Sequence, residues 1–438
     1  MFDLPKYGQG ICMARVAELL DVLAIDRDSL RERTIAITGS NGKGSTAAFC
    51  ASIGSAYGLR TGLFTSPHLF RVNERFQVDG APIDDGRLRE SAARIIAAIE
   101  AVSQRRNEQF GAFEAMFALA CLYFQESGCG LMVFEAGIGG RYDPVRLLGS
   151  RVTTVVSVDY EHVDLLGNSL ELIVSDKSDA CAAGGTVIYG ENCRALRPHI
   201  AEYNRSWDVE SLFVGDDVKI GGGDAASIGQ RFDFAFRSLD FHALDIALPG
   251  SFQLNNAAIA TALFASWLER TRPGEPAARI EAAVRNGLHE ARWPGRLETI
   301  ARDPLTVIDV GHTPDGIRQS LAGLHQTHGA QNWILVAGVS FDKKATEIGR
   351  LLAPHFDFIV STSAHHKGGD AAALAGAMRN ANPQARVEIA ASIEQAFATS
   401  RALAVSLDRR IYVAGGLFTA IEYAAAARGL DPKQLTFF

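Results

Sequence analysis

The stretch from Thr34 to Thr46, TIAITGSNGKGST, decides how the fold of this chain is interpreted. It begins with a short apolar run, continues as a glycine-rich turn and leads into an alanine-rich segment, which is the order strand, loop, helix. Glycines at positions 39, 42 and 44 let the backbone approach a polyphosphate and turn its N–H groups inward. Lys43 adds a positive charge, and a hydroxyl at Ser45 or Thr46 can ligate Mg²⁺. The stretch predicts a phosphate-binding loop, although its spacing departs from the common G-x-x-x-x-G-K-[ST] form.

The composition indicates a folded protein of two domains. The chain has 438 residues, 47% of them hydrophobic and 21% charged, and this length exceeds what one core usually supports. A net charge of −7 argues against nucleic acid and anionic membranes as partners, since both require a basic field. The six cysteines include no C-x-x-C pair, which favours a reducing compartment over a zinc or disulfide framework.

The sequence predicts neither a targeting segment nor a membrane span. The first residues, MFDLPKYGQG, lack a basic region followed by an apolar core. The longest apolar segment, 112–124, carries Glu114 and is too short to cross a bilayer. We therefore expect a cytoplasmic protein and, because no long apolar helix requires a partner, a monomer.

Strands alternate with helices around the phosphate loop. Apolar runs at 60–64, 131–134 and 152–158 indicate strands, and periodic segments indicate helices at 11–23, 47–57, 90–102 and 112–126. This alternation predicts an α/β domain with a doubly wound, mostly parallel sheet, whose ligands lie at the carboxyl ends of the strands. The loops at those ends carry Ser66, Glu135 and His162. A hydroxyl, a carboxylate and an imidazole beside a phosphate loop can surround Mg²⁺ or orient a substrate.

The pattern changes twice in the second half of the chain. Short alternating runs with glycine clusters between about 186 and 250 predict a small antiparallel β insert. Helices follow at 257–270 and 276–288, and the amides of Gln253 and Asn256, with Asn255 as the near alternative, can bind adenine. The segment WPGR, 293–296, is then the expected domain boundary, with Arg296 reaching the phosphates when the domains close. We expect domains at 1–296 and 297–438.

The region after the boundary predicts a second, smaller, Rossmann-like α/β domain. Strands are expected at 305–310, 333–338, 358–361, 387–389 and 410–413. Polar residues again follow these strands, and they are Asp309 and His312, then Asp342 and Lys343, then His365, His366 and Lys367. The adjacent histidines suggest a solvated loop rather than a metal site, because neighbouring loop residues rarely converge on one ion.

Ordered motifs along nearly the whole chain resemble the folylpolyglutamate synthase and dihydrofolate synthase family, a branch of the Mur ligases. These motifs are TGSNGKGST, TSPHLFRVNERF, EAGIGGRYD, EHVDLLGNSLELIVSDK, LPGSFQLNNAAIATAL, WPGRLE, IDVGHTPDGI, GVSFDKK and VAGGLF. The resemblance implies an ATP-dependent amide ligase in which a carboxylate attacks the γ-phosphate of ATP, and an amino-acid amine then attacks the acyl phosphate and expels phosphate. A phosphate loop with Lys43 and Mg²⁺ supplies the charge neutralisation and alignment that such phosphoryl transfer needs.

The resemblance also implies roles for individual residues. The expected nucleotide-binding residues are Gly39, Asn41, Gly42, Lys43, Gly44, Ser45, Thr46, Gln253, Asn256, Arg296 and Asp309. The expected Mg²⁺ ligands are Ser45, Ser66, Glu135 and His162, and a second Mg²⁺ is a further expectation. The expected catalytic residues are Lys43, His162, Lys177, Arg296, Asp309 and His312. Lys177 lies where similar enzymes carry a lysine carbamylated by CO₂, and Asp309 and His312 are expected to face the cleft toward nucleotide and incoming amino acid.

Departures from the family pattern lie in the substrate loops and leave three hypotheses. The family's Gly-Gly-Arg-Leu-Asp-Ala-Thr-Asn is GGRYDPVR at 139–146, its Asp-His is Glu161-His162, its His-Asn-Pro is HTP at 312–314, and its Gly-Ser-Leu-Tyr is GGLF at 415–418. The first hypothesis is a ligase that adds glutamate to a folate or pteroate carboxylate. The second is a divergent Mur-type ligase that joins another carboxylic acid to another amine, and the third is a non-catalytic nucleotide-binding paralogue. Because a site loses discrimination when its hydrogen-bonding partners vanish, the changed loops support the second hypothesis.

Overall fold

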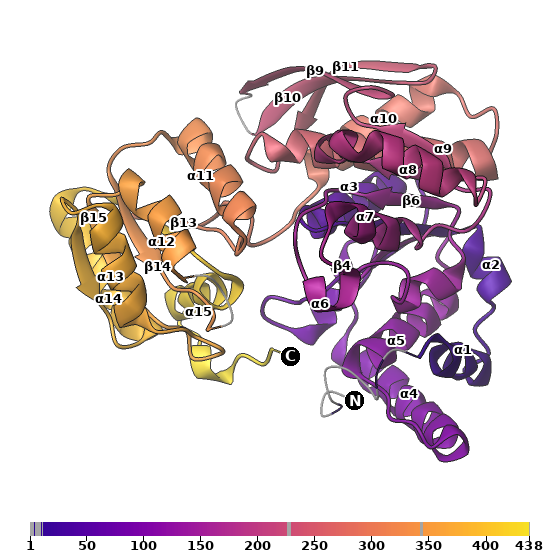
Figure 1. Cartoon of the computed structure of the whole chain (residues 1–438), viewed down its shortest axis with the longest axis horizontal. Helices are drawn as coiled ribbons and strands as arrows, with labels where there is room; N and C mark the ends of the chain where they lie inside the picture. Colours follow the sequence, from indigo (N-terminus) through magenta and orange to yellow (C-terminus); the bar gives the residue numbers. More distant parts are fainter. Residues whose placement is uncertain (1–3, 5–9, 11, 226–228, 342–344, 438) are drawn as a thin grey trace.

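A computed structural model describes residues 4, 10, 12–225, 229–341 and 345–437. Asp342 and Lys343, which follow a strand in the sequence, lie outside the described residues, as does most of the N-terminal stretch quoted above. The chain forms two α/β domains that lie side by side (Figure 1). The prediction of two α/β domains with mostly parallel sheets is therefore confirmed.

The N-terminal domain is built on an eight-stranded sheet in the order β4-β3-β2-β5-β1-β6-β7-β8. Its strands are β1 (Thr34–Thr38), β2 (Thr61–Phe64), β3 (Phe76–Val78), β4 (Ala81–Pro82), β5 (Leu131–Glu135), β6 (Val152–Val155), β7 (Thr186–Tyr189) and β8 (Glu210–Phe213). Strands β2, β5, β1, β6, β7 and β8 run parallel, and β3 and β4 complete one edge as an antiparallel pair. The central strand β1 is fully buried, as an apolar strand in a sheet covered on both faces must be.

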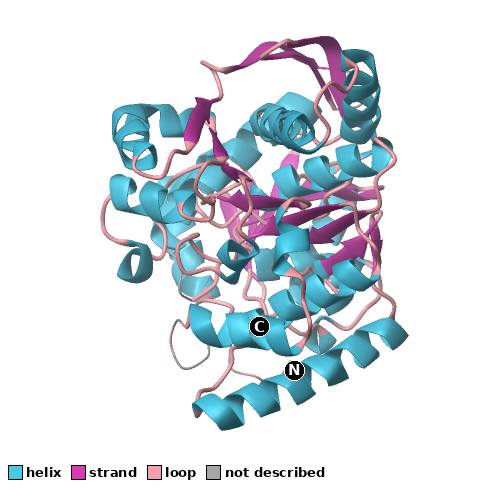
Figure 2. Ribbon diagram, turned by 90° about the vertical axis from the view of Figure 1, so that its right-hand side faces the viewer, coloured by secondary structure: helices cyan, strands magenta, loops and turns pink. Residues whose placement is uncertain are grey.

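Helices cover both faces of this sheet (Figure 2). They are α1 (Met13–Val22), α2 (Arg27–Arg31), α3 (Lys43–Ala56), α4 (Asp85–Arg106), α5 (Ala112–Glu126), α6 (Val163–Leu166), α7 (Leu170–Ser178), α8 (Arg197–Arg205), α9 (Phe252–Thr271) and α10 (Ala277–Glu290). Ile35 and Ile37 pack with α3, α9 and α10 on one face, whereas Ala36 packs with α4 and α5 on the other. The period of two along β1 thus places successive side chains in two different cores.

A separate antiparallel sheet contains β9 (Val218–Ala225), β10 (Gln230–Phe236) and β11 (Leu239–Ile246), and it packs on α9 and α10 (Figure 1). Its range corrects the insert of about 186–250 that the sequence suggested. The run at 186–189 and the run at 210–213 join the main sheet as parallel strands. Short apolar runs look alike in both kinds of sheet, so the pattern of hydrophobic residues did not separate them.

The C-terminal domain has a six-stranded sheet in the order β12-β13-β17-β14-β15-β16. Its strands are β12 (Glu298–Arg302), β13 (Leu305–Ile308), β14 (Trp333–Ala337), β15 (Phe358–Ser361), β16 (Arg386–Ile389) and β17 (Arg410–Ala414). Its helices are α11 (Pro314–His328), α12 (Ala345–Leu352), α13 (Ala371–Ala381), α14 (Ile393–Leu407) and α15 (Leu417–Ala427). Strand β12 is an antiparallel edge that the sequence analysis missed, and the other strands are parallel as expected.

Five short 3₁₀ helices complete the assignment over the described residues: η1 (Val72–Arg75), η2 (Pro144–Leu148), η3 (Glu191–Leu196), η4 (Ala353–His355) and η5 (Pro432–Gln434). The chain after η5 runs back toward the N-terminal domain (Figure 1). Among the helices of the described residues, none combines the length and apolar character that a bilayer crossing requires.

Candidate active site

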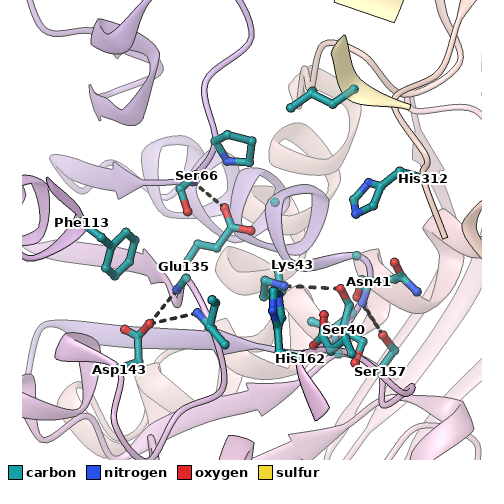
Figure 3. Close-up of a pocket in the computed structure, with 18 of the residues that line it drawn as sticks. Ser40, Asn41, Lys43, Ser66, Phe113, Glu135, Asp143, Ser157, His162 and His312 are labelled. Carbon is teal, nitrogen blue, oxygen red and sulfur yellow. Dashed lines mark hydrogen bonds between the residues drawn. The ribbon is translucent and has the colours of Figure 1, made fainter. Parts of the chain in front are cut away.

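A cleft of about 1180 Å³ lies where the two domains face each other. Its N-terminal wall consists of the loops that follow β1, β2, β5 and β6, which are neighbours in the sheet. Its C-terminal wall consists of residues that follow β13, β14, β15 and β17, together with Phe437. Parallel neighbours end at the same edge of a sheet, which is why side chains from such distant parts of the sequence meet there. Figure 3 shows Ser66, Glu135, Lys43 and His162 around this pocket together with His312 of the C-terminal domain.

The glycines of the phosphate loop are required by close contacts. Gly42 has φ +84°, and a Cβ there would lie 2.6 Å from Asn256 Oδ1. Gly44 lies in the first turn of α3, where a Cβ would lie 2.6 Å from Cζ2 of Trp293. A side chain at either position would displace the neighbouring group. The loop therefore carries no Cβ at Gly42 and Gly44, where the chain enters α3, and a helix start is an arrangement suited to anions.

Two hydroxyl residues that the sequence analysis did not single out hold this loop in place. Ser157 Oγ donates to the Asn41 carbonyl (2.9 Å) and accepts from the Asn41 N–H (2.8 Å). Ser40 Oγ accepts from the Asp159 N–H at 3.0 Å. The ammonium of Lys43 donates to the Gly39 carbonyl at 2.7 Å. The turn after β6 thus fixes the phosphate loop through backbone groups on both sides (Figure 3).

Glu135 is a buried carboxylate surrounded by cationic side chains. It is 4% exposed, and its Oε2 accepts from the Ser66 N–H at 3.0 Å. Burial raises the pKa of Glu135, and the charges of Lys43, Arg296 and Arg75 oppose that rise. Carboxylates in such a place are costly unless a charge partner is present. Glu135 therefore fits a role beside a cation at the edge of the phosphate loop.

The amides expected to bind adenine have different surroundings. Gln253 is fully buried, its Nε2 donates to Ser45 Oγ at 3.3 Å, and its Oε1 accepts from Asn256 Nδ2 at 2.9 Å. Asn256 and its neighbour Asn255 both line the cleft. Asn255 Oδ1 also accepts from the Glu191 N–H at 3.1 Å. Gln253 thus supports the hydroxyl of Ser45 from below, and the asparagines are the amides within reach of a ligand.

Lys177 lies beneath the cleft and pairs with Glu161. Its side chain is 1% exposed and its Nζ donates to Glu161 Oε1 at 2.6 Å. Burial lowers the pKa of Lys177, while Glu161 opposes that shift. Burial alone would raise the pKa of Glu161, but Lys43 and Lys177 together lower it to about 2. The next residue, His162, has φ +45° and lines the cleft at the start of α6.

The predicted domain boundary is held by Asp309, which is 1% exposed. Its carboxylate accepts from Ser320 Oγ (2.6 Å), from the Gly311 N–H (2.8 Å) and from the Leu297 N–H (3.1 Å). Through these three hydrogen bonds, Asp309 fixes the segment at the domain boundary to the loop that follows β13. Arg296 lines the cleft directly beside it.

Two further contacts connect the C-terminal domain to the N-terminal wall. His312 lines the cleft, and Thr313 Oγ donates to Asn41 Oδ1 of the phosphate loop at 3.4 Å. His68, which follows β2, is buried between Arg75 and the chain after η5. Its Nδ1 accepts from Arg75 Nε (2.9 Å) and its Nε2 donates to the Thr436 carbonyl (2.7 Å). Burial first, and then the charge of Arg75, lower the pKa of His68 to about 4.

The loop after β5 forms a mixed aromatic and polar part of the N-terminal wall. Asp143 is buried, and its Oδ2 accepts from the Gly137 and Ile138 N–H groups at 2.8 and 3.2 Å. Tyr142 is 52% exposed and lines the cleft together with Phe113. This part of the wall offers aromatic surface beside the carboxylate of Glu135.

The described part of the chain contains no group of three or more His, Cys, Asp and Glu side chains that could hold a metal ion. The expected ligands Glu135 and His162 do line one cleft with the oxygen donors Ser45 and Ser66. The hydroxyl of Thr46 is buried and has no hydrogen-bond partner. This set suits a hard cation that takes part of its shell from phosphate and water.

Comparisons with known proteins agree on one family. The family described as Mur ligase, glutamate ligase domain, matches residues 295–417. The dihydrofolate synthase/folylpolyglutamate synthase of Bacillus subtilis is 32% identical over 320 residues, covering 72% of each chain. The folylpolyglutamate synthase of Lacticaseibacillus casei is 31% identical over 338 residues, covering 77% of this chain and 78% of the relative.

Solved structures extend the likeness to both domains. The Mycobacterium tuberculosis folylpolyglutamate synthase complexed with ADP has a TM-score of 0.85 at 25% identity, covering 97% of this chain and 95% of that one. A complex of folylpolyglutamate synthase with AMPPCP and folate has a TM-score of 0.81 at 28% identity, covering 97% of this chain and 96% of that one.

Proposed function

This chain belongs to the folylpolyglutamate synthase family of ATP-dependent carbon–nitrogen ligases, and from that membership we propose that it uses ATP to join glutamate to a folate or pteroate carboxylate. The observation that carries the proposal is the cleft itself. It combines an uncovered phosphate loop with a buried carboxylate, Glu135, that faces Lys43, Arg296 and Arg75. Both ADP and folate are bound by relatives of the same fold.

The reaction requires a phosphoryl transfer and then an acyl transfer. We assign the first to residues of the N-terminal wall and the second to residues of the C-terminal wall. An oxygen of the folate carboxylate attacks the γ-phosphorus, the bond to the β-phosphate oxygen breaks, and ADP leaves. The glutamate amine then attacks the acyl carbon, loses a proton and expels phosphate. Lys43 and the loop N–H groups neutralise the phosphates, and Arg296 adds charge from the domain boundary. His312, on the C-terminal wall, is placed toward the amine.

Mg²⁺ fits the residues of the N-terminal wall. The unpartnered buried hydroxyl of Thr46, the hydroxyl of Ser45 and the carboxylate of Glu135 are oxygen donors of the kind this ion prefers. Ser66 and His162 are the further proposed ligands. Bound Mg²⁺ neutralises phosphate charge. Gly42 and Gly44 then hold the phosphates by backbone contacts, Asn41 keeps the shape of the loop through its bonds to Ser157, and Asn256 holds the base.

Lys177 is proposed to act as a carbamate. Burial lowers the pKa of its amine, and a neutral amine is the form that reacts with CO₂. When Lys177 is not carbamylated, its ammonium form pairs with Glu161 instead. We expect Lys177→Ala to abolish ligation, with partial recovery when short carboxylic acids are added. Undiminished activity of the variant would contradict the carbamate, and an intact-mass increase of the protein in bicarbonate would support it.

The same proposal covers the domain limits and the assembly state. Residues 1–296 form the nucleotide domain and residues 297–438 the amino-acid domain. The protein acts on small molecules as a monomer in the cytoplasm. Sedimentation of the purified protein tests the monomer, and a second species would contradict it.

The decisive experiment measures phosphate release from Mg-ATP by the purified protein. Dihydropteroate or tetrahydrofolate with glutamate is compared with a panel of other carboxylic acids and amines. Release only with the folate pair is the expected result. Release only with another pair keeps the ligase chemistry and overturns the substrate, and no release with any pair overturns the ligase.

One observation favours a second candidate, a ligase for a non-folate carboxylic acid. Tyr142 occupies the loop that departs from the family pattern, and its half-exposed ring lines the acid side of the cleft. A large aromatic side chain there changes the shape that an acid must match. The panel of acids in the phosphate-release assay separates the two candidates.

A further inference from the structure

Among the described residues, one lysine of the C-terminal domain lines the cleft, and the loop that carries it is fixed by hydrogen bonds. Lys367 lies in the loop between β15 and α13, has φ +51° and lines the cleft. Its carbonyl accepts from the Phe341 N–H at 3.0 Å, and the Gly369 N–H donates to the Val339 carbonyl at 2.7 Å. The loop is therefore fastened to the segment that follows β14, on both sides of the lysine.

A buried carboxylate in α15 fixes the same loop through two backbone N–H groups. Glu422 lies in the alanine-rich helix α15 and is fully buried. Its Oε2 accepts from the His365 N–H at 2.7 Å and its Oε1 from the His366 N–H at 2.9 Å. Burial raises the pKa of Glu422, and these N–H groups oppose the rise. A carboxylate inside an apolar helix face is costly, so its bonds to two successive N–H groups indicate that the loop must be held in one shape.

Aromatic rings pack near the lysine, and Lys367 is the cationic side chain that the described residues place on this part of the wall. The His366 ring centroid lies 4.6 Å from that of Phe418 and 5.0 Å from that of Phe437. Phe418 and Phe437 line the cleft beside Lys367. Within the described residues, no carboxylate forms an ion pair with Lys367. The sequence analysis took the histidine pair to lie in a solvated loop, whereas the His366 ring packs in this aromatic cluster.

We propose that Lys367 is a specificity-determining residue that binds a carboxylate of the incoming amino acid, and that Glu422 is the residue that positions it. This inference rests on the proposed function. Glutamate keeps two carboxylates when its amine reacts, and a half-buried cation at the edge of an apolar wall suits one of them. The phosphates of ATP are bound on the opposite wall, at the start of α3.

The test is steady-state kinetics of the full chain with glutamate as the varied substrate. We expect Lys367→Met to raise KM for glutamate about 10- to 100-fold, which is the loss of one charge-assisted hydrogen bond. KM for ATP and kcat at saturating glutamate should change less than about threefold. Lys367→Arg should recover part of the affinity. Lys219→Met, the same substitution at an exposed lysine of β9, should match the parent.

Two results would overturn the inference. An unchanged KM for glutamate in Lys367→Met would remove the lysine from the amino-acid site. An equal rise in KM for ATP would place it at the phosphates instead. If the parent protein uses another amino acid, that compound replaces glutamate in the same comparison. The role of Lys367 can therefore be tested even if the proposed function is wrong.

Glu422→Gln tests the positioning part separately. The amide retains one acceptor for the two N–H groups, so we expect a rise in KM for glutamate that is smaller than in Lys367→Met. Thermal unfolding of the variant shows whether the domain remains folded. A folded Glu422→Gln protein with the parent's KM for glutamate would contradict a positioning role.

Discussion

The phosphate loop on the N-terminal wall is fixed through its backbone, whereas the C-terminal wall presents single side chains on loops that buried carboxylates hold. Around the phosphate loop, Gly42 and Gly44 leave no room for a Cβ. The Ser157 hydroxyl bonds the backbone of Asn41 in the loop, and the loop's own Ser40 hydroxyl accepts from the Asp159 N–H. On the other wall, Asp309 and Glu422 are buried carboxylates that hold the loops carrying His312 and Lys367.

The difference predicts which parts of this site tolerate substitution. A backbone site for a polyphosphate depends on the shape of the loop, so almost any substitution in it alters the chemistry common to all substrates. A side chain on a buried support can be exchanged while its loop keeps its course. The departures at Thr313 and Phe418 lie in the C-terminal domain, and those at Tyr142 and Glu161 lie on the N-terminal wall outside the phosphate loop. The phosphate loop itself keeps its lysine and all three glycines.

The largest effect should come from removing the charge of the N-terminal wall. We expect Lys43→Ala to lower kcat/KM about 10²- to 10³-fold, as the loss of one transition-state charge contact does elsewhere. Phosphate release under subsaturating ATP measures it, with Lys219→Ala as the control for a lysine outside the cleft. Retention of more than about a tenth of the activity would mean that backbone N–H groups alone hold the phosphates.

A somewhat smaller loss is expected at the buried carboxylate. Glu135→Gln keeps the shape but leaves Lys43, Arg296 and Arg75 without their anion, so kcat/KM should fall about 10²-fold, equivalent to roughly 3 kcal/mol. The concentration of Mg²⁺ needed for half-maximal rate should rise in the same titration. Glu290→Gln, at the exposed end of α10, controls for the chemical change. An unaltered Mg²⁺ requirement would exclude Glu135 as a ligand.

The backbone character of the N-terminal wall can be tested with two glycines. Gly42→Ala places a Cβ 2.6 Å from Asn256 Oδ1, and we expect KM for ATP to rise about tenfold, or roughly 1.4 kcal/mol. Gly80→Ala is the matched control, because Gly80 has φ +75° and a Cβ there would meet nothing within 4 Å. Equal effects of the two substitutions would attribute the loss to backbone strain and not to crowding.

The last effect concerns folding stability and the bond that joins the walls. His68 has a pKa of about 4 when folded and about 6.5 when unfolded, so the unfolded chain binds a proton first as the pH falls. Its stabilising contribution is present above pH 6.5 and is lost as the pH falls toward 4. Between pH 7 and 5 we expect the parent to lose about 2 kcal/mol more of unfolding free energy than His68→Gln in urea titrations. Equal losses in both proteins would show that His68 does not contribute to the pH dependence of the unfolding free energy.

Much of this architecture could be predicted from the sequence because its elements are long or strongly patterned. The helix at 112–126 and the strands at 131–134 and 358–361 were expected within one residue of their observed bounds. Polar residues directly after strands located the cleft, since the carboxyl ends of parallel strands share an edge.

The rest depended on contacts that carry no pattern along the chain. Ser157 is a single small residue in the segment after β6, and only the fold brings it to the phosphate loop. Likewise, only the fold brings the Asp159 N–H to the hydroxyl of Ser40 within that loop. Gln253 has the chemistry to bind a base, yet burial turns its amide toward Ser45. Glu422 did offer a signal, because it is a lone carboxylate among alanines. A buried carboxylate at such a position needs hydrogen-bond donors, which here are two backbone N–H groups.

The contact between Gly44 and Trp293 gives the molecule an optical property. The indole of Trp293 packs against the first turn of α3 and begins the segment that joins the domains. The other three tryptophans, Trp207, Trp267 and Trp333, lie after α8, within α9 and in β14. Trp293 is therefore a fluorophore at the junction between the phosphate loop and the segment that joins the domains. In a variant that keeps it as the single tryptophan, we expect its emission to change when a nucleotide enters the loop.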